Sequence, residues 1–279
     1  MVEVEVPSAV EALWVEDKGN FLVSFFFSYD IIKLISGDIM LITSVNNDRI
    51  KELVKLKEKK NRDNNDLFFV EGYDIVLEAY KNNCIKELYV LDGTFVDMDL
   101  PVTYVSYDVM KKISDMDSVS EYYAVCNKKS ELELGNRIII LDGIQDPGNL
   151  GTIIRSAVAF NFDTVVLGKN CVDLYNPKVI RSTKGMLFNK NVIIRELDDF
   201  MLSLSDYVIY GTDVISGDNV KNIDSSLKVA IVIGNEGRGI TDSVRKLCNK
   251  FIYIPMSEDC ESLNAGVAAS ILMYEVNNR

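Results

Sequence analysis

From residue 137 onward the chain alternates short apolar runs with segments of helical spacing, and this alternation limits the folds that it can adopt. The runs are "RIIILDG" at 137–143, then "TVVLGKN", "NVIIREL", "DYVIYGTD", "VAIVIGN" and "KFIYIPM". Each is long enough for one buried strand. Strands that alternate with helices favour an α/β domain with a parallel sheet, so we expect one over residues 137–279.

Residues 40–125 alternate in the same way and predict a smaller α/β domain. Strands are expected at "LFFVEG", "IKELYVLDG" and "PVTYVS", and helices at "YDIVLEAYKNN" (73–83) and "YDVMKKISDMDS" (107–118). The polar stretch "CNKKSELELGN", 126–136, is typical of a linker between the two domains.

The first 39 residues differ from the rest, with two basic residues against seven acidic ones. Met40 then opens "MLITSVNNDRIKEL", which has the pattern of a natural N-terminus: a short strand, a polar turn and a helix. The preceding "SGDIM" can be encoded by a purine-rich block of the kind found upstream of start codons. We therefore expect Met40 to be the true start and 1–39 an over-extended gene prediction. A genuine N-terminal extension is the alternative.

The composition excludes several classes of function. The chain has no histidine, which excludes Ser-His-Asp and Cys-His nucleophile systems and every histidine-ligated metal site, and we expect no metal. Its five cysteines show no CxxC spacing, which indicates free thiols in a reducing cytoplasm. The most apolar stretch, 20–29, is far shorter than the roughly 20 residues that a membrane span needs, so we expect no membrane partner.

A formal net charge of −12 argues against nucleic-acid binding over the whole surface. However, "RIKELVKLKEKKNR" at 49–62 has seven basic residues against two acidic ones, a local balance of +5. This segment is either a solvated amphipathic helix or an electrostatic footprint for phosphates. The candidate RNA-binding residues are Arg49, Lys55, Lys57, Lys59, Lys60 and Arg62.

The first stretch with a chemical signal is "LDGIQDPGNLGTIIRSAVAF", 141–160. A buried strand and a Pro-Gly turn precede Asn149, which we expect to cap a helix that begins near Gly151. Arg155 lies one helical turn further on, on the face that we expect to be directed at the mouth of a site. The chain contains neither GxxxxGK[ST] nor GxGxxG, which argues against kinases and dehydrogenases.

The second stretch is "VAIVIGNEGRGI", 229–240, where an apolar strand leads into a loop with three glycines. Glycines let a backbone turn sharply and approach a ligand closely. Ligands of open parallel sheets bind at the carboxyl ends of strands, where this loop would lie. A glycine-rich turn without a ligand is the alternative for the loop taken alone.

The third stretch is "FIYIPMSEDCESLNAGVAASILMYE", 251–275. Pro255 ends the strand, and Ser262 and Asn264 mark a helix start. Small residues follow at the beginning of this helix, so another backbone can pack closely against it.

In this order the three stretches resemble the signature motifs of the SpoU (TrmH) family of RNA ribose 2′-O-methyltransferases, within the SPOUT class. The family patterns are N-x-G-x-x-x-R, then G-x-E-x-x-G after a strand, then I-P-M followed by E-S-L-N. They stand here as Asn149, Gly151 and Arg155; Gly234, Glu236 and Gly239; and Ile254-Pro255-Met256 with Glu261-Ser262-Leu263-Asn264. The resemblance extends to 40–125, which looks like the family's substrate-binding domain.

The resemblance implies a parallel sheet with a deep trefoil knot, preceded by a small α/β domain similar to certain ribosomal proteins. It also implies S-adenosylmethionine as cofactor and a homodimer through the knotted domain, with residues of both chains completing the site. The implied cofactor-binding residues are Thr212, Gly234, Asn235, Gly237, Ile254, Met256, Leu263 and Asn264. The implied catalytic residues are Arg155, Asn149, Glu236, Ser262 and Asn264.

By resemblance Arg155 activates the ribose hydroxyl. We interpret it as a group that positions the phosphate and stabilises developing alkoxide charge, since a guanidinium is hard to deprotonate. Asn149 would orient Arg155 and the ribose, and Glu236 would hold the loop or Asn149, or accept a proton. One position departs from the family pattern: Glu258 stands where a glycine is common, so we expect this loop to be more acidic where it would contact RNA or cofactor.

The substrate-binding domain favours folded RNA as the partner, and ribosomal RNA over transfer RNA. Three alternatives stay open: a transfer-RNA methyltransferase, an antibiotic-resistance methyltransferase acting on ribosomal RNA, and a non-catalytic ribosome- or RNA-binding protein with the same fold.

Overall fold

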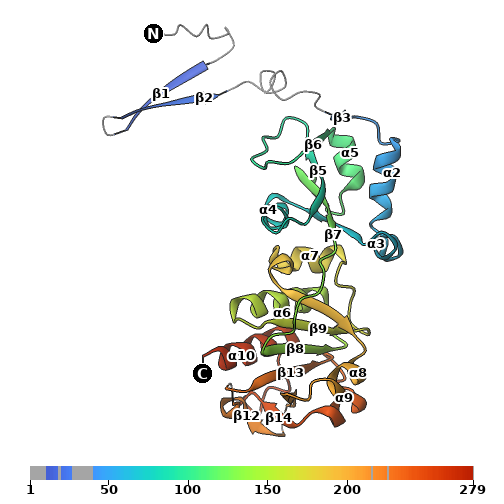
Figure 1. The fold of residues 1–279 in the computed structure, drawn as a ribbon, viewed down its shortest axis with the longest axis vertical. Coiled ribbons are helices and arrows are strands. Elements are labelled where there is room, and N and C mark those ends of the chain that lie inside the picture. The colour runs from blue at the N-terminus through green and yellow to red at the C-terminus, as the bar shows by residue number, and fades with distance from the viewer. Residues whose placement is uncertain (1–10, 18–19, 27–39, 215, 225, 279) are drawn as a thin grey trace.

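The computed structural model describes residues 11–17, 20–26, 40–214, 216–224 and 226–278. Strands β1 (Glu11–Asp17) and β2 (Asn20–Phe26) pair antiparallel with each other and form a hairpin apart from the two larger sheets (Figure 1). The expectation that Met40 is the true start concerns residues 1–39, many of which lie outside the described ranges, and it stays a prediction.

The first domain is built on a five-stranded mixed sheet with the order β3-β6-β5-β7-β4. Its strands are β3 (Met40–Ile42), β4 (Leu67–Glu71), β5 (Ile85–Leu91), β6 (Val102–Val105) and β7 (Tyr122–Asn127). Its helices are α2 (Asp48–Lys55), α3 (Lys59–Asn65), α4 (Tyr73–Lys81) and α5 (Tyr107–Ile113). β7 lies between β5 and β4 and extends two residues into the segment expected as linker.

The basic segment 49–62 is two helices, not one. α2 ends at Lys55, a turn follows, and α3 begins at Lys59. The turn brings the backbone carbonyls of Leu56 and Lys57 toward the guanidinium of Arg62, which donates hydrogen bonds to both, at 2.9 and 2.7 Å. The break therefore has a structural use, because the arginine satisfies carbonyls that a helix end leaves without partners.

The second domain contains a seven-stranded sheet in which every pairing is parallel, as expected. The order is β10-β9-β8-β13-β11-β14-β12. The strands are β8 (Arg137–Asp142), β9 (Thr164–Gly168), β10 (Asn191–Arg195), β11 (Tyr207–Thr212), β12 (Asp218–Asn219), β13 (Lys228–Gly234) and β14 (Lys250–Tyr253). The helices are α6 (Pro147–Ala159), α7 (Pro177–Thr183), η1 (Met186–Asn189), α8 (Leu197–Leu202), η2 (Val220–Asn222), α9 (Asp242–Leu247) and α10 (Ala265–Asn277).

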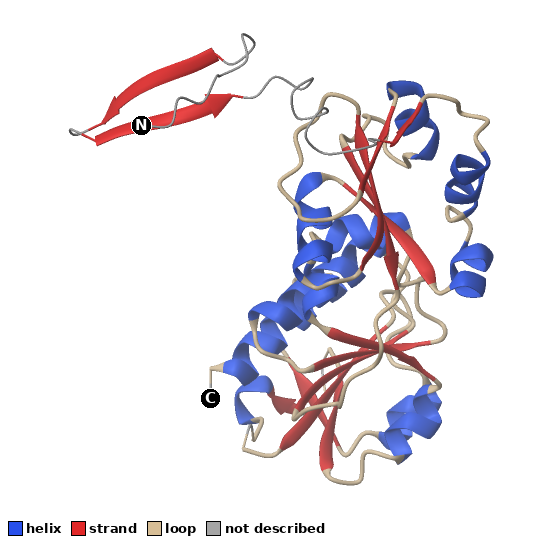
Figure 2. Ribbon diagram, turned by 45° about the horizontal axis from the view of Figure 1, so that its top comes forward, coloured by secondary structure: helices blue, strands red, loops and turns tan. Residues whose placement is uncertain are grey.

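Helices cover both faces of this sheet (Figure 2). One face packs on α8 and α9 through a cluster that includes Phe200 and Val244. The other face packs on α6, α7 and α10, and its apolar cluster continues without interruption into the first domain. At that junction the ring of Phe68 in β4 lies 4.6 Å from that of Tyr175 and 5.9 Å from that of Phe188. One apolar cluster therefore spans the two domains.

The last strand of the sheet is inserted between two earlier ones. β14 lies between β11 and β12, although both precede it in the chain. The connection from β11 to β12 lies against β14, because a Cβ at Gly217 would stand 2.4 Å from the carbonyl oxygen of Phe251. Gly217 also has a φ of +117°, which a side chain rarely allows, so this crossing requires glycine.

None of the helices within the described ranges combines the length and the hydrophobicity that crossing a bilayer requires.

Candidate active site

A cavity of about 360 Å³ lies at the carboxyl ends of β11, β13 and β14, which is where ligands of open parallel sheets bind. The second and third sequence motifs form most of its wall. Seven of the eight predicted cofactor-binding residues line it: Thr212, Gly234, Asn235, Gly237, Ile254, Met256 and Leu263. The eighth, Asn264, lies just beside the wall, between the lining residues Leu263 and Ala265.

The glycine-rich loop after β13 is a tight hairpin. Asn235 and Gly239 exchange two backbone hydrogen bonds of 2.9 Å, which closes the loop on itself. A Cβ at Gly234 would lie 2.2 Å from the carbonyl carbon of Gly239, so this closure requires glycine there. A Cβ at Gly239 would meet no protein atom within 4 Å, which leaves its side of the cavity open to a ligand.

A chain of side-chain hydrogen bonds connects the three motifs. The Nδ2 of Asn149 donates to Oε1 of Glu236 at 2.9 Å, and the Oδ1 of Asn149 accepts from Nδ2 of Asn264 at 2.8 Å. The Oδ1 of Asn264 then accepts from the backbone N–H of Val267 at 3.2 Å, which caps α10. The bond between Asn149 and Glu236 agrees with the expected hold of Glu236 on Asn149, and Ser262 is a residue of the cavity wall. The catalytic roles of these residues stay predictions.

Glu236 is held as an anion by this chain. Partial burial raises the pKa of its carboxyl. Hydrogen bonds from the Asn149 side chain and from backbone amides together lower the pKa by more, so the pKa is lowered overall. A carboxylate with a lowered pKa is a weaker base than a free one. The geometry therefore favours the predicted holding role of Glu236 over that of proton acceptor.

The predicted start of the first-motif helix is wrong by one turn. α6 begins at Pro147, and the side chain of Asp146, not that of Asn149, caps it by accepting from the Asn149 backbone N–H at 2.8 Å. Asp followed by Pro is a strong helix-start signal, since the aspartate accepts an orphan N–H and the proline has none to offer. Asn149 is 7% exposed inside the first turn, and its side chain is free to reach Glu236 and Asn264.

Arg155 lies apart from the cavity of its own chain. It is exposed on α6, two turns beyond Asn149, and it is not among the residues that line the cavity. The cavity of the same chain is therefore not the site toward which Arg155 is directed, and its predicted catalytic role stays a prediction.

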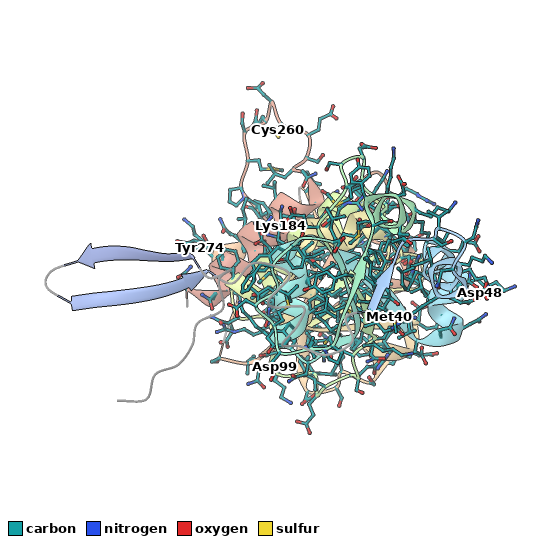
Figure 3. All side chains as sticks on the ribbon, turned by 90° about the horizontal axis from the view of Figure 1, so that it is seen from above. Met40, Asp48, Asp99, Lys184, Cys260 and Tyr274 are labelled. Atoms are coloured by element: carbon teal, nitrogen blue, oxygen red, sulfur yellow. The ribbon has the colours of Figure 1, made fainter. Side chains whose placement is uncertain are left out.

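The loop between β14 and α10 projects from the body of the domain, with Cys260 near its tip (Figure 3). Every residue from Ser257 to Ser262 is exposed, and Glu258 belongs to this run. The loop is thus acidic and open to solvent where the family pattern has a glycine.

Sequence reasoning missed a polar pair beside the cavity. Asp213 lines the cavity directly after Thr212, and its Oδ2 accepts from the guanidinium of Arg245 at 2.6 Å. The guanidinium also lies over the ring of Phe251, 4.2 Å from the centroid. The only signal in the sequence was the position of Asp213 at the end of a strand.

The six predicted RNA-binding residues differ in exposure and in the groups that they contact. The prediction for Arg62 is wrong, because this residue is 3% exposed and its guanidinium donates to Asp173 of the second domain at 2.6 Å. Arg49, Lys55 and Lys59 pair with nearby carboxylates, and the Nζ of Lys57 donates to the Ser114 carbonyl. For the residues other than Arg62, RNA contact stays a prediction.

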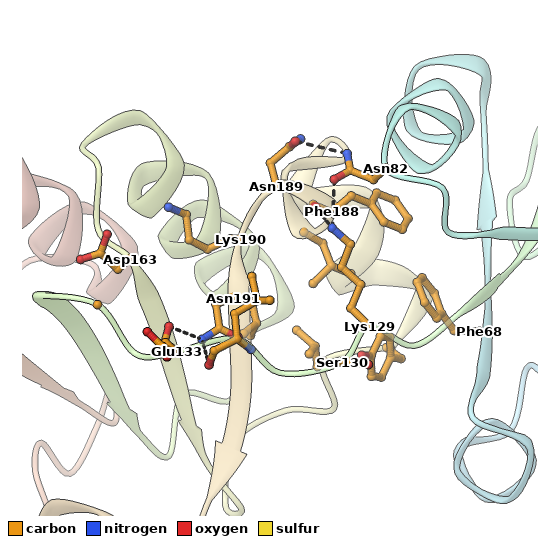
Figure 4. A pocket seen from close by; sticks show the side chains of 16 residues that line it. Phe68, Asn82, Lys129, Ser130, Glu133, Asp163, Phe188, Asn189, Lys190 and Asn191 are labelled. Atoms are coloured by element: carbon orange, nitrogen blue, oxygen red, sulfur yellow. Dashed lines mark hydrogen bonds between the residues drawn. The ribbon is translucent and has the colours of Figure 1, made fainter.

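A larger cavity, of about 530 Å³, lies at the junction of the two domains (Figure 4). Its wall includes Lys129, whose Nζ donates to Oδ1 of Asn82 at 2.9 Å and to the carbonyl oxygen of Phe188. None of the three motifs contributes to it. We therefore assign the chemistry to the smaller cavity, where the motifs converge.

A parallel sheet with a glycine-lined cavity at its carboxyl edge, and with the hydrogen-bonded side chains of Glu236, Asn149 and Asn264 beside it, defines an α/β protein built to bind a nucleotide-like ligand. Residues 136–274 match the SpoU rRNA methylase family, and residues 47–124 match the MRM3-like substrate binding domain. The chain belongs to the SpoU rRNA methylase family.

Individual proteins agree with this assignment. The chain is 34% identical over 243 residues to the 23S rRNA (guanosine(2553)-2′-O)-methyltransferase RlmP of Bacillus subtilis, an alignment that covers 84% of this chain and 98% of that protein. The crystal structure of an rRNA methyltransferase from Sinorhizobium meliloti superposes with a TM-score of 0.76 at 25% identity, covering 87% and 98% of the two chains. The SpoU methyltransferase AviRb from Streptomyces viridochromogenes, solved in complex with the cofactor AdoMet, has the same fold, with a TM-score of 0.74 at 24% identity over 84% and 98%.

Proposed function

We propose that this protein transfers a methyl group from S-adenosylmethionine to a ribose 2′-hydroxyl of ribosomal RNA. The observation that carries the proposal is the Asn264–Asn149–Glu236 hydrogen-bond chain at the rim of the cavity. It connects residues that lie 87 and 115 positions apart, and these are motif residues of the family to which the chain belongs.

The cavity fits the cofactor on two grounds. Apolar side chains such as Ile233, Ile252 and Leu272 offer a wall for an adenine ring, and the glycines of the hairpin leave backbone groups accessible to polar atoms. Its volume of about 360 Å³ is in the range of pockets for ligands of this size. When bound, S-adenosylmethionine supplies a methyl group on a positively charged sulfur.

The residues of this chain supply orientation and charge. Asn149, held on both sides by Glu236 and Asn264, presents a fixed amide at the rim of the cavity. Ser262, on the wall, offers a hydroxyl that can hold the ribose. A guanidinium near the 2′-oxygen would stabilise the negative charge that develops as its proton leaves. Positioning of this kind is a large share of catalysis when the leaving group is already activated.

We propose that the guanidinium comes from Arg155 of a second copy of the chain. Arg155 does not line its own cavity, while Thr152, Arg155 and Ala159 form an exposed stripe on α6. α10 packs beside α6 through the Ser156–Ser270 hydrogen bond of 2.7 Å and carries exposed apolar side chains at Val267 and Tyr274. Adjacent exposed stripes on two packed helices suit a two-fold interface that exchanges Arg155 between sites.

We also propose that the sheet is closed by a trefoil knot, which the insertion of β14 between β11 and β12 supports. The 34% sequence identity to RlmP, which extends over 98% of that protein, favours 23S rRNA as the substrate. Free thiols at all five cysteines and a ribosomal substrate favour the cytoplasm as the location.

The test is transfer of labelled methyl groups to RNA from a strain that lacks this gene, with ribosomal and transfer fractions measured separately. We expect the label in ribosomal RNA, within a dinucleotide that resists alkali because its 2′-oxygen is methylated. Label in transfer RNA would instead identify transfer RNA as the substrate. Absence of label from both, with cofactor binding intact, would refute the catalytic proposal and favour an RNA-binding protein.

Two variants test the shared site. Arg155→Ala should abolish transfer and keep cofactor affinity, since Arg155 lies outside the cavity. Gly239→Trp should fill the cavity and keep Arg155. Mixed in equal amounts, the two inactive proteins should recover roughly a quarter of wild-type activity, because half of the dimers then hold one complete site. No recovery, in a mixture shown by mass to contain mixed dimers, would refute the exchange of Arg155.

A further inference from the structure

One segment of this acidic chain carries no acidic residue at all. Leu174–Asn191 contains Lys178, Arg181, Lys184 and Lys190 without a single Asp or Glu, in a protein of net charge −12. Three of the four cations belong to α7 or to the residue that ends it. The basic segment 49–62, in contrast, is interleaved with carboxylates.

α7 crosses α6 directly beside the first motif. A Cβ at Gly151 would lie 2.3 Å from Cβ of Ser182 and 2.7 Å from its carbonyl carbon, so the two backbones are in contact at this point. Gly151 lies one helical turn before Arg155 on α6. Lys178 lies one turn before Ser182 on α7, which places it close to α6, the helix that contains Arg155.

The other end of α7 reaches the first domain. Arg181 pairs with Asp115 at 3.3 Å, and a Cβ at Gly185 would lie 2.8 Å from the side chain of Glu78 in α4. α7 therefore spans the distance between the substrate-binding domain and the first-motif helix, as Figure 1 also shows.

The two outer lysines of this helix are exposed and uncompensated. Among the described residues, no carboxylate lies within ion-pair distance of Lys178 or Lys184. Lys55 and Lys59 on the basic segment already have partners, Glu52 at 2.6 Å and Asp63 at 2.5 Å. A phosphate that approaches Lys178 or Lys184 displaces only water and counterions, whereas one that approaches Lys55 or Lys59 must compete with a carboxylate.

We propose that Lys178 and Lys184 bind the phosphate backbone of the substrate RNA and guide it from the first domain to the methyl-transfer site. This inference rests on the proposed function, since it names how that substrate is held. The recognition is of charge and not of bases, because flexible ammonium groups contact phosphates as point charges. Arg181, already paired with Asp115, orients the helix between them.

The test compares two charge-matched double variants. Lys178→Gln/Lys184→Gln removes the proposed contacts. Lys246→Gln/Lys250→Gln removes two exposed charges at α9 and β14, away from α6 and α7. Affinity for an unmodified 23S rRNA transcript is measured across a series of salt concentrations, with cofactor affinity by calorimetry and with kcat and KM for the RNA.

We expect the slope of log Kd against log salt to fall by about 1.4–1.8 in the α7 variant, because each phosphate contact contributes roughly 0.7–0.9. KM for RNA should rise at least tenfold with cofactor affinity unchanged, and the control should match the wild type. Equal slopes in all three proteins, or equal losses in both variants, would overturn the proposal.

Failure of the proposed function would look different. A wild type that binds the transcript with an α7-dependent slope but transfers no methyl would leave the phosphate contacts standing and refute the catalytic role. A wild type that methylates the transcript with a slope indifferent to α7 would do the reverse. No binding to the transcript at any salt concentration would refute both.

Discussion

Replacing Arg62 by methionine tests whether this residue serves the fold or the RNA. Its side chain is 4% exposed and donates to the carbonyls of Leu56 and Lys57 and to the carboxylate of Asp173. Methionine keeps most of the volume but removes all three charge-assisted hydrogen bonds. Asp173 would then lie in the domain junction without its cation, at a side-chain exposure of 16%.

Removing one partner of a buried pair costs about 3–5 kcal/mol. We take the lower end, about 3 kcal/mol, because Asp173 retains some access to water. For a protein of this size the urea m-value is near 3 kcal/mol/M, so the unfolding midpoint of Arg62→Met should fall by about 1 M. One apolar cluster spans both domains, and we expect them to unfold together.

Lys59→Met is the matched control, because Lys59 lies on the same helix and pairs with Asp63 at side-chain exposures of 61% and 44%. An exposed pair contributes less than about 1 kcal/mol, so the midpoint should move by no more than about 0.3 M. Equal midpoints in the two variants would refute the structural role. Weaker RNA binding by Arg62→Met at unchanged stability would restore Arg62 to the RNA surface.

Three further changes are predicted. Burial raises the pKa of Glu71 by more than its hydrogen bonds lower it, so ionisation of Glu71 costs folding stability as pH rises through the folded-state pKa. The urea midpoint of Glu71→Gln should therefore exceed that of the wild type toward pH 8, and the difference should disappear below about pH 4.5. A difference that does not change with pH would contradict this. Gly217→Ala should destabilise by at least about 2 kcal/mol, because its Cβ would overlap Phe251, whereas Gly93→Ala, also at positive φ but with open space around it, should cost about 1–2 kcal/mol in the same urea assay; equal losses would count against the close crossing. Asn149→Ala should lower the rate of methyl transfer about 10²-fold, measured with labelled cofactor, because the chain that positions the rim is broken; a rate near wild type would exclude that role.

The strands could be predicted from the sequence because they depend on short-range patterns, whereas the convergence of the motifs was implied by the resemblance to the family. Apolar runs of strand length mark β8 and β13 whatever their neighbours are. The error at α6 came from choosing Asn149 over Asp146 as the cap; both are good caps, and only Pro147 favours the earlier one.

Other features depend on distant contacts and left little signal. Arg62 looks like its basic neighbours in the sequence, and only the turn after α2 and the presence of Asp173 make it a buried residue. The proposed phosphate contacts of α7 were also not anticipated, since four cations in the 18 residues Leu174–Asn191 are unremarkable until the absence of carboxylates is set against the fold. Local composition does not reveal which charges will find partners.

The position of β14 in the sheet and the contacts at the rim of the cavity depend on each other. Because β14 lies between β11 and β12, the start of α10 that follows it is placed where Asn264 reaches Asn149. A chain with β14 paired at a free edge of the sheet would keep all three motifs and lack the hydrogen-bond chain between them. The cavity therefore depends on a long-range strand pairing, unlike a site on a single loop. This dependence explains how residues so far apart in sequence come into hydrogen-bond contact, as the proposed orientation of a ribose requires.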